Sequence, residues 1–284
     1  MKKLSVIIVS YNNLELICNC LDSIQEFNDI KDQLEVIVVE QSPTDEVYNS
    51  LIEKYSWIKL IRNSNMGYGG GNNVGCRNAT GEILLFLNPD TLLIEPIFSY
   101  MLEQYEKNPR LGIAGCRLLD GDRNYVQSFF WKDSISNMKG VVWRVLDRID
   151  LFLPKRMFIT GADIFVPKIL FEQAGMFDEQ IFMYSEETDI CNRVENLGYQ
   201  TCFFKEKRII HLEGKTTEDN YVKKELQKMK SFIRVSEKQG IRRDKILRKA
   251  QRAARHRSWI FYFVNRDRYH LEKELIERYR TGAL

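Results

Sequence analysis

Residues 4–13 read LSVIIVSYNN, an almost unbroken apolar run, rich in β-branched side chains, that ends at Ser10 and a polar turn. Such a run is typical of a strand buried on both faces, as the strands of a parallel sheet are. It is too short for the apolar region of a signal peptide, so we expect a strand rather than a targeting segment.

The same alternation of apolar runs and helical segments continues through the first 110 residues. Further buried strands are predicted at residues 34–39, 57–61 and 83–87, and helices at residues 14–24, 73–79 and 96–107. Strands that alternate with helices are typical of an open, mostly parallel α/β sheet flanked by helices.

The second half of the chain is less regular. We predict a hairpin over residues 118–130, an amphipathic helix over 135–150 and one strand over 158–166. A helix is expected to begin near Glu186 and run to Leu197, and the chain beyond Thr216 reads as almost wholly helical.

Polar segments follow the first, second and fourth predicted strands, at residues 10–13, 40–45 and 88–90. In open α/β sheets, ligands bind beyond the carboxyl ends of the strands. These three segments are therefore the first indication of a binding site.

The glycine-rich run at residues 65–75 reads NMGYGGGNNVG. It fails the dinucleotide fingerprint, because Asn72 or Val74 stands where the last glycine is required, and it fails the phosphate loop, because Cys76 replaces the lysine. Two interpretations stay open: a turn before a helix whose backbone N–H groups approach a sugar or phosphate, or a turn needed for close packing.

Acidic residues with a possible chemical role occur in two places. Asp90 closes a buried strand, where it either binds a divalent cation or caps a following helix. Glu186, Glu187 and Asp189 crowd a helix start, which favours a raised pKa and a general base but also suits helix capping. His211 follows two isoleucines and, taken alone, reads as a core residue.

Taken together, the motifs resemble the family-2 glycosyltransferases with the GT-A fold, in particular the rhamnosyltransferase-like members. The resemblance runs in order over about residues 4–265, through VIIVSYNN, VVEQSPTDE, NMGYGGGNNVG, LLFLNPDT, the long segment from GADIFV to ENLGYQ, IIHLEG and RHRSWIFYFVNR. It implies a catalytic domain at residues 1–215, with a nucleotide-sugar half (1–117) and an acceptor-side half (118–215). A basic helical extension at residues 216–284 completes the chain.

The resemblance also implies a role for individual residues. Glu187 would be the general base and Glu186 would orient the acceptor, while Asp90 and His211 would hold Mg²⁺ or Mn²⁺ on the donor diphosphate. The implied donor-binding residues are Ser10, Tyr11, Asn12, Glu40, Gly71, Asn72 and Asn88. The implied acceptor-side residues are Gly161, Ala162, Asp163 and Asp189.

This chain departs from the family pattern at a few of these positions. Glu40 and Gln41 stand where the family usually has Asp and Asn, so the base pocket must be reshaped. Asn88 replaces the first acid of an Asp-x-Asp motif, and Glu187 stands where Asp is frequent. We expect activity to survive these changes.

The implied function is that of an inverting, metal-dependent glycosyltransferase. It would move a sugar from a nucleotide-diphosphate donor, dTDP-rhamnose or a UDP-sugar, to a glycan or lipid-linked acceptor in cell-surface polysaccharide synthesis. The alternatives are a nucleotidyltransferase, which would release pyrophosphate, and a non-catalytic sugar-binding relative.

The net charge of +3 is the sum of an acidic first part of the chain and a basic C-terminal tail. Residues 1–204 carry 19 Lys and Arg against 28 Asp and Glu, whereas residues 205–284 carry 23 against 11. Within the tail, residues 241–257 hold eight Lys and Arg with one acid, and the apolar run 259–264 follows. This pattern suits an anionic membrane surface contacted through residues 241–264; a helical hairpin that packs on the body or forms a homodimer stays open.

Other sequence features limit the partners and the cellular compartment that we expect for the protein. The acidic body and the lack of any recognised nucleic-acid motif argue against nucleic-acid binding. The six scattered cysteines read as buried thiols of a reducing compartment, and no stretch approaches the roughly 20 apolar residues of a membrane span. We expect a cytoplasmic protein, at most peripheral on the inner face of the plasma membrane.

Overall fold

The computed structural model describes residues 3–132, 150–212 and 221–284. Within these residues a sheet of eight strands runs in the order β3-β2-β1-β4-β9-β6-β10-β5, beside a small sheet of β7 and β8. The main-sheet strands are β1 (Leu4–Ser10), β2 (Leu34–Glu40), β3 (Lys59–Arg62), β4 (Ile83–Leu87), β5 (Thr91–Leu93), β6 (Leu111–Leu119), β9 (Asp163–Pro167) and β10 (Gln200–His211).

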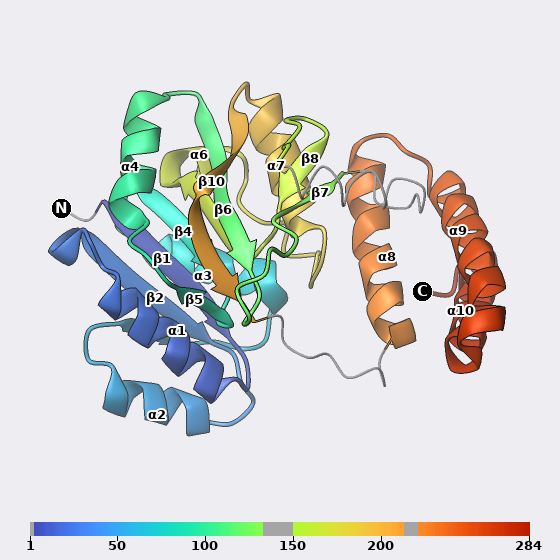
Figure 1. Cartoon of the computed structure of the whole chain (residues 1–284), viewed down its shortest axis with the longest axis horizontal. Helices are drawn as coiled ribbons and strands as arrows, with labels where there is room; N and C mark the ends of the chain where they lie inside the picture. The colour runs from blue at the N-terminus through green and yellow to red at the C-terminus, as the bar shows by residue number, and fades with distance from the viewer. Residues whose placement is uncertain (1–2, 133–149, 213–220) are drawn as a thin grey trace.

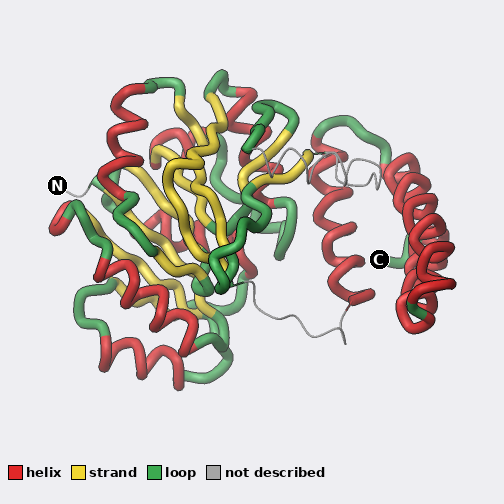
Figure 2. Tube along the Cα trace, viewed as in Figure 1, coloured by secondary structure: helices red, strands yellow, loops and turns green. Residues whose placement is uncertain are grey.

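Strands β3, β2, β1 and β4 pair in parallel, as do β6 and β10, whereas β9 runs antiparallel to both of its neighbours and β5 antiparallel to β10. Helices cover both faces of this sheet (Figures 1 and 2). Along β1, Leu4, Val6 and Ile8 face one core cluster and Ile7 faces the other. This alternation explains why the run at residues 4–9 is apolar at nearly every position.

One helical layer consists of α1 (Leu14–Glu26), α2 (Glu46–Lys54) and α4 (Phe98–Lys107), which pack on the first cluster. The other consists of α3 (Gly67–Asn78), α6 (Lys168–Gln173) and α7 (Glu186–Asn196), which pack on the second. A short 3₁₀ turn at Lys31–Gln33 precedes β2. The predicted α/β architecture with a mostly parallel sheet is confirmed.

The predicted C-terminal extension is also helical where the structure describes it. It consists of α8 (Tyr221–Lys238), α9 (Arg243–Val264) and α10 (Arg266–Thr281), with α8 lying between the sheet domain and the α9–α10 hairpin (Figure 1). Glu272 of α10 is fully buried; its carboxylate accepts hydrogen bonds from Arg257 of α9 at 2.7 Å and from Tyr221 of α8 at 2.8 Å. These bonds join the three helices.

Several local predictions were wrong. The glycine-rich run does not form a turn before a helix, because α3 already begins at Gly67. No helix begins directly after Asp90, since β5 follows it and α4 starts only at Phe98, so Asp90 is not a helix cap. The strand expected at residues 158–166 is two strands, β8 (Met157–Ile159) and β9, separated by residues 160–162.

The hairpin expected at residues 118–130 is reduced to a single bridge between Leu119 and Tyr125, because β7 (Phe129–Trp131) pairs with β8 instead. The helix predicted at residues 135–150 lies almost entirely outside the described residues. All six cysteines are free thiols. Among residues 3–132, 150–212 and 221–284, no helix has the length and apolar character needed to cross a membrane.

Candidate active site

Ser10 and Glu40 end the neighbouring parallel strands β1 and β2, and both are fully buried. Glu40 Oε1 accepts a hydrogen bond from the Ser42 amide at 2.6 Å, and the Asn12 amide donates to Ser42 Oγ at 2.7 Å. Ser10 Oγ and Glu40 Oε2 are buried without a hydrogen-bond partner among the described residues. Buried polar atoms are nearly always paired, so this position is suited to receive the polar edge of a ligand.

The other predicted donor-side residues lie around this position. Tyr11, directly after β1, is exposed. Asn72 is buried in α3; its Nδ2 donates to the Tyr68 carbonyl at 3.1 Å, whereas its Oδ1 has no partner among the described residues. A Cβ at Gly71 would lie 2.8 Å from Val9 Cγ2 of β1, so glycine lets α3 approach the sheet closely.

Asp90 and His211 lie together at the edge of the sheet, because β10 pairs with β5 so that His211 is opposite Thr91. His211 Nε2 is 3.3 Å from Asp90 Oδ1 and 3.5 Å from Asn88 Nδ2. The first separation is compatible with two ligands that each lie about 2.1 Å from one cation. Both side chains keep some contact with solvent, at 15% and 17% exposure.

These two groups are suitable ligands for a divalent cation, which in proteins is often held by few side chains and by substrate phosphates. Within the described residues, no group of three or more His, Cys, Asp or Glu is arranged to hold a metal by itself. The Asp90–His211 pair therefore fits a cation that takes its other ligands from a bound diphosphate.

Glu186 and Glu187 open helix α7 after a strained turn. Tyr184 and Ser185 both have a left-handed backbone, with φ of 70° and 71°, which is unfavourable for residues other than glycine. Burial raises the pKa of both glutamates, and the neighbouring Glu187 charge raises the pKa of Glu186 further. Hydrogen bonds from the Gly161 and Ser185 amides oppose this rise for Glu187.

Residues 160–162 connect the acid pair with the Asp90 side of the site. A Cβ at Gly161 would lie 2.6 Å from Glu187 Oε1, so any larger residue would displace that carboxylate. The carbonyl of the next residue, Ala162, accepts the Asn88 amide proton at 3.0 Å. The site residues near Asn88 and near Glu187 are 99 positions apart in sequence, and this short turn contacts both.

Sequence reasoning missed Tyr68 as a site residue. Its hydroxyl donates to the Gly161 carbonyl at 2.7 Å, and its pKa is raised well above the usual value by burial and by the charges of Glu187 and Glu186. The only sequence feature that pointed to Tyr68 was its aromatic side chain within the glycine-rich run. Nothing in the sequence relates it to Gly161, which lies 93 positions later.

The structure gives the last two acceptor-side acids different surroundings. Asp163 is fully buried at the start of β9, accepts the Cys116 amide proton at 2.5 Å, and has a pKa raised to about 7 by burial. Asp189 forms ion pairs with Arg193 at 2.7 Å and Lys238 at 3.0 Å. These two cations pair with the Asp189 carboxylate, and its predicted place on the acceptor side stays a prediction.

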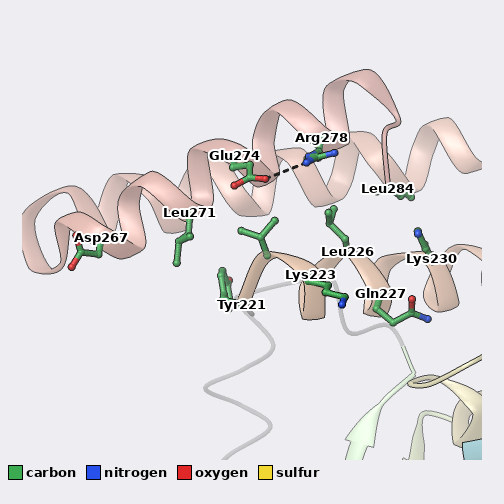
Figure 3. Close-up of a pocket in the computed structure, with 11 residues that line it drawn as sticks. Tyr221, Lys223, Leu226, Gln227, Lys230, Asp267, Leu271, Glu274, Arg278 and Leu284 are labelled. Carbon is green, nitrogen blue, oxygen red and sulfur yellow. Dashed lines mark hydrogen bonds and ion pairs between the residues drawn. The ribbon is translucent and has the colours of Figure 1, made fainter. Parts of the chain in front are cut away.

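A groove of about 700 Å³ lies between α8 and α10 (Figure 3). Its walls carry acidic, basic and apolar side chains from these helices and from Leu284, the last residue. None of the residues named above as site residues lines it. The groove is therefore separate from the candidate site.

A family model described as glycosyl transferase family 2 matches residues 5–159, more than half of the chain. The chain belongs to this family. Among family members, the O-antigen biosynthesis protein RfbC of Myxococcus xanthus is 24% identical over 223 residues, which are 75% of this chain and 17% of that protein. The probable glycosyltransferase YdaM of Bacillus subtilis is 23% identical over 214 residues, 71% of this chain and 49% of that one. The match thus spans less than half the length of these two relatives.

An N-acetylglucosaminyl-diphospho-decaprenol L-rhamnosyltransferase of Mycobacterium tuberculosis is 22% identical over 208 residues, covering 64% of this chain and 67% of that enzyme. Among solved structures, the mannosyltransferase PcManGT of Pyrobaculum calidifontis, in complex with GDP-Man and Mn²⁺, superposes with a TM-score of 0.61 at 16% identity. That comparison covers 99% of this chain and 76% of the other. Residues 1–349 of S. aureus TarS give a TM-score of 0.56 at 16% identity, covering 99% and 92%. These similarities show that this family-2 chain has the GT-A fold.

Proposed function

We propose that this family-2 chain is an inverting glycosyltransferase that moves a sugar from a nucleotide-diphosphate donor to an acceptor hydroxyl. The observation that carries the proposal is the turn at residues 160–162, which contacts both Glu187 of the acid pair and the segment that holds Asp90. A group-transfer site needs a place for the leaving diphosphate and a base for the attacking hydroxyl, and these two clusters supply one each.

Glu187 is the proposed general base. In an inverting transfer it accepts the acceptor hydroxyl proton on its carboxylate while that oxygen attacks the anomeric carbon from the face opposite the diphosphate. Its raised pKa makes its carboxylate a stronger base than that of an exposed glutamate. Burial and the charge of Glu187 raise the pKa of Glu186, which is proposed to orient the acceptor by hydrogen bonding.

Asp90 and His211 are proposed to hold Mg²⁺ or Mn²⁺. When bound, such a cation supplies positive charge that stabilises the leaving nucleotide. The Mn²⁺ of the Pyrobaculum mannosyltransferase complex supports this assignment for the fold.

The donor side is proposed to comprise Ser10, Tyr11, Asn12, Glu40, Asn72 and Asn88, with Gly71 allowing the close approach of α3. The unpaired buried atoms at Ser10 and Glu40 support a nucleobase at the ends of β1 and β2. We propose dTDP-rhamnose or a UDP-sugar as donor. The acceptor would be a glycan or lipid-linked sugar of cell-surface polysaccharide synthesis, in keeping with the O-antigen and decaprenol-linked names of relatives.

Calorimetric titration of UDP and of dTDP, each with Mn²⁺ and again with EDTA, tests the donor and metal assignments. We expect one nucleotide to bind in the micromolar range with Mn²⁺ and at least tenfold more weakly with EDTA, at a cost of about 1.4 kcal/mol. Asp90→Ala should remove the difference between the two conditions. Folded protein that binds neither nucleotide would contradict the proposal.

A nucleotidyltransferase is the rival that shares a nucleotide pocket and a metal carboxylate. Product analysis separates the two functions: the proposed reaction releases a nucleoside diphosphate and transfers the sugar, whereas the rival releases pyrophosphate. A non-catalytic sugar-binding relative would bind nucleotide and release neither product.

We also propose that the end of the α9–α10 hairpin binds an anionic membrane surface, which would place the protein peripherally on the cytoplasmic face. On α9 the buried positions are Ile246, Ala250, Ala254 and Ser258, at four-residue spacing. The opposite side carries the exposed Arg252, Arg255, Trp259 and Phe263. Aromatic side chains next to arginines on one helical face suit the headgroup region of an anionic bilayer.

A further inference from the structure

Helix α8 contacts the segment that carries the acid pair through one face. Lys228, Ser231, Arg234 and Lys238 share that face by their spacing of three or four residues. Each of the four contacts residues 178–189, which include Glu186 and Glu187. Figure 1 shows α8 between the sheet domain and the α9–α10 hairpin, and Lys238 of α8 contacts Asp189 of α7.

The strongest contacts are ionic. Arg234 binds Asp178 with two hydrogen bonds, Nε to Oδ2 at 2.6 Å and Nη2 to Oδ1 at 3.0 Å. Lys238 Nζ lies 2.5 Å from Asp178 Oδ2 and 3.0 Å from Asp189 Oδ1. Burial alone would raise the pKa of Asp178, but these two cations hold it well below its usual value. Lys238 thus connects two aspartates that lie on either side of the acid pair in sequence.

Helix α8 also contacts the strained turn, which lies between Asp178 and Asp189 in sequence. Ser231 Oγ donates to the Met183 carbonyl at 2.7 Å, and Lys228 Nζ lies 5.6 Å from the centre of the Tyr184 ring. Tyr184 and Ser185 have the left-handed backbone that turns the chain into α7. A backbone of this kind persists only where surrounding contacts hold it.

Helix α3 holds the same segment from the other side. Asn73 bonds the Phe177 backbone twice, as acceptor from its amide at 3.0 Å and as donor to its carbonyl at 2.9 Å. The Tyr68 amide donates to the Phe182 carbonyl at 3.1 Å. The turn before Glu186 is therefore held between a helix of the nucleotide-sugar half and a helix of the C-terminal extension.

We infer that Arg234 and Lys238 are positioning residues for the acid pair, so that the C-terminal extension is part of the catalytic apparatus. The inference rests on the proposed function, because it assigns these residues an effect on the step that Glu187 performs. Neither side chain is proposed to touch substrate. Their effect is to keep residues 178–189 in the conformation that directs Glu187 toward Gly161.

The test compares Arg234→Gln and Lys238→Gln with Lys230→Gln, which removes an exposed lysine from the same helix. The first readout is hydrogen exchange of peptides spanning residues 178–189. We expect about tenfold faster exchange in the first two variants and the wild-type rate in Lys230→Gln. Wild-type exchange in all three, in protein that remains folded by circular dichroism, would overturn the inference.

The second readout is turnover of the nucleotide sugar that the wild type accepts. Because a small displacement of a catalytic group costs much of the rate, a displaced Glu187 should lower kcat about tenfold or more. The dissociation constant of the matching nucleoside diphosphate, measured with Mn²⁺, should stay unchanged. Arg234→Lys should recover part of the lost kcat. Faster exchange with a wild-type kcat would also overturn the inference. A wild-type protein that turns over no nucleotide sugar would instead refute the proposed function. In that case the hydrogen-exchange result alone decides whether Arg234 and Lys238 hold residues 178–189.

Discussion

Glu186 and Glu187 are adjacent carboxyls whose surroundings raise both pKa values. Burial raises both pKa values, and the charge of Glu187 raises that of Glu186 further, whereas hydrogen bonds from backbone amides oppose the rise in both. Two acids that interact this closely lose their protons in separate steps that belong to the pair. Two neighbouring acids can in this way serve as base and hydrogen-bond donor at one pH.

Glu187→Gln should lower kcat by about 10²–10⁴-fold, the usual contribution of a general base. Nucleoside diphosphate binding should not change, because the amide keeps the shape of the side chain and the donor side lies at other residues. Steady-state kinetics and calorimetry on the same preparation measure both. Glu172→Gln, which changes a half-exposed carboxylate of α6, is the control and should keep wild-type kcat.

The pH dependence follows from the direction of the Glu187 shift. Catalysis needs the ionised form, so kcat should fall as pH is lowered through the pKa of Glu187. Because that pKa is raised, the fall should be half complete at a pH above 4.5, the ordinary value for glutamate. The acid limb should be missing in Glu187→Gln. A wild-type rate that stays constant down to about pH 4.5 would contradict the assignment.

At the level of secondary-structure elements, the turn between β8 and β9 has the most direct effect on the site. Gly161→Ala would put a methyl group 2.6 Å from Glu187 Oε1, so that the carboxylate must move. A shift of about 1 Å can cost roughly 100-fold in rate, and we expect a loss of kcat of that order. The measurement is kcat together with the melting temperature, which separates misplacement from unfolding.

Gly121→Ala is the matched control for this prediction. A Cβ at Gly121 would meet its nearest atom, Leu212 Cδ2, at an ordinary 3.5 Å. This variant should therefore keep the wild-type rate. If Gly161→Ala also keeps it, the Glu187 carboxylate is not confined by this turn.

The elements that the sequence predicts correctly are those with a local signal. Strands β1, β2 and β4 are apolar runs that end in polar residues, and α1 and α4 have apolar side chains at helical spacing. Helix α3 begins six residues earlier than the predicted helix, at Gly67 rather than Asn73. Glycine disfavours helix, but close packing of Gly71 and Gly75 on Val9 and Ile7 outweighs that preference here.

The parts that could not be predicted depend on contacts between distant residues. Strand β5 has three residues, and its place is set by pairing with β10, more than 100 residues later. The ion pair of Asp189 with Lys238 likewise joins residues 49 positions apart. The motifs predicted Asp90, His211, Glu186 and Glu187 as candidate site residues, but no pattern in the sequence relates Tyr68 to Gly161 or α8 to the acid pair.

At the scale of the whole molecule, a group of exposed apolar side chains lies at the end of α9, where the α9–α10 hairpin turns. Trp259, Phe263 and Val264 are 66%, 71% and 75% exposed, and the Trp259 and Phe263 rings contact each other with centres 5.8 Å apart. Arg266 lies 4.2 Å from the centre of the neighbouring Tyr262 ring. Exposed apolar groups of this size, beside cations, are typical of an interaction surface.

Replacing Trp259 and Phe263 together by serine should weaken binding to anionic vesicles without unfolding the hairpin, because neither side chain is part of its core. Loss of about 2 kcal/mol of apolar transfer corresponds to roughly 30-fold weaker partitioning. Co-sedimentation with phosphatidylglycerol vesicles measures the effect, and phosphatidylcholine vesicles should bind the wild type poorly because they lack the anionic charge. Ile169→Ser is the control, since Ile169 of α6 is 70% exposed but lies on the sheet domain. If the double variant partitions like the wild type but converts a dimer to a monomer in light scattering, the surface is a contact between two copies of the chain and the membrane proposal is wrong.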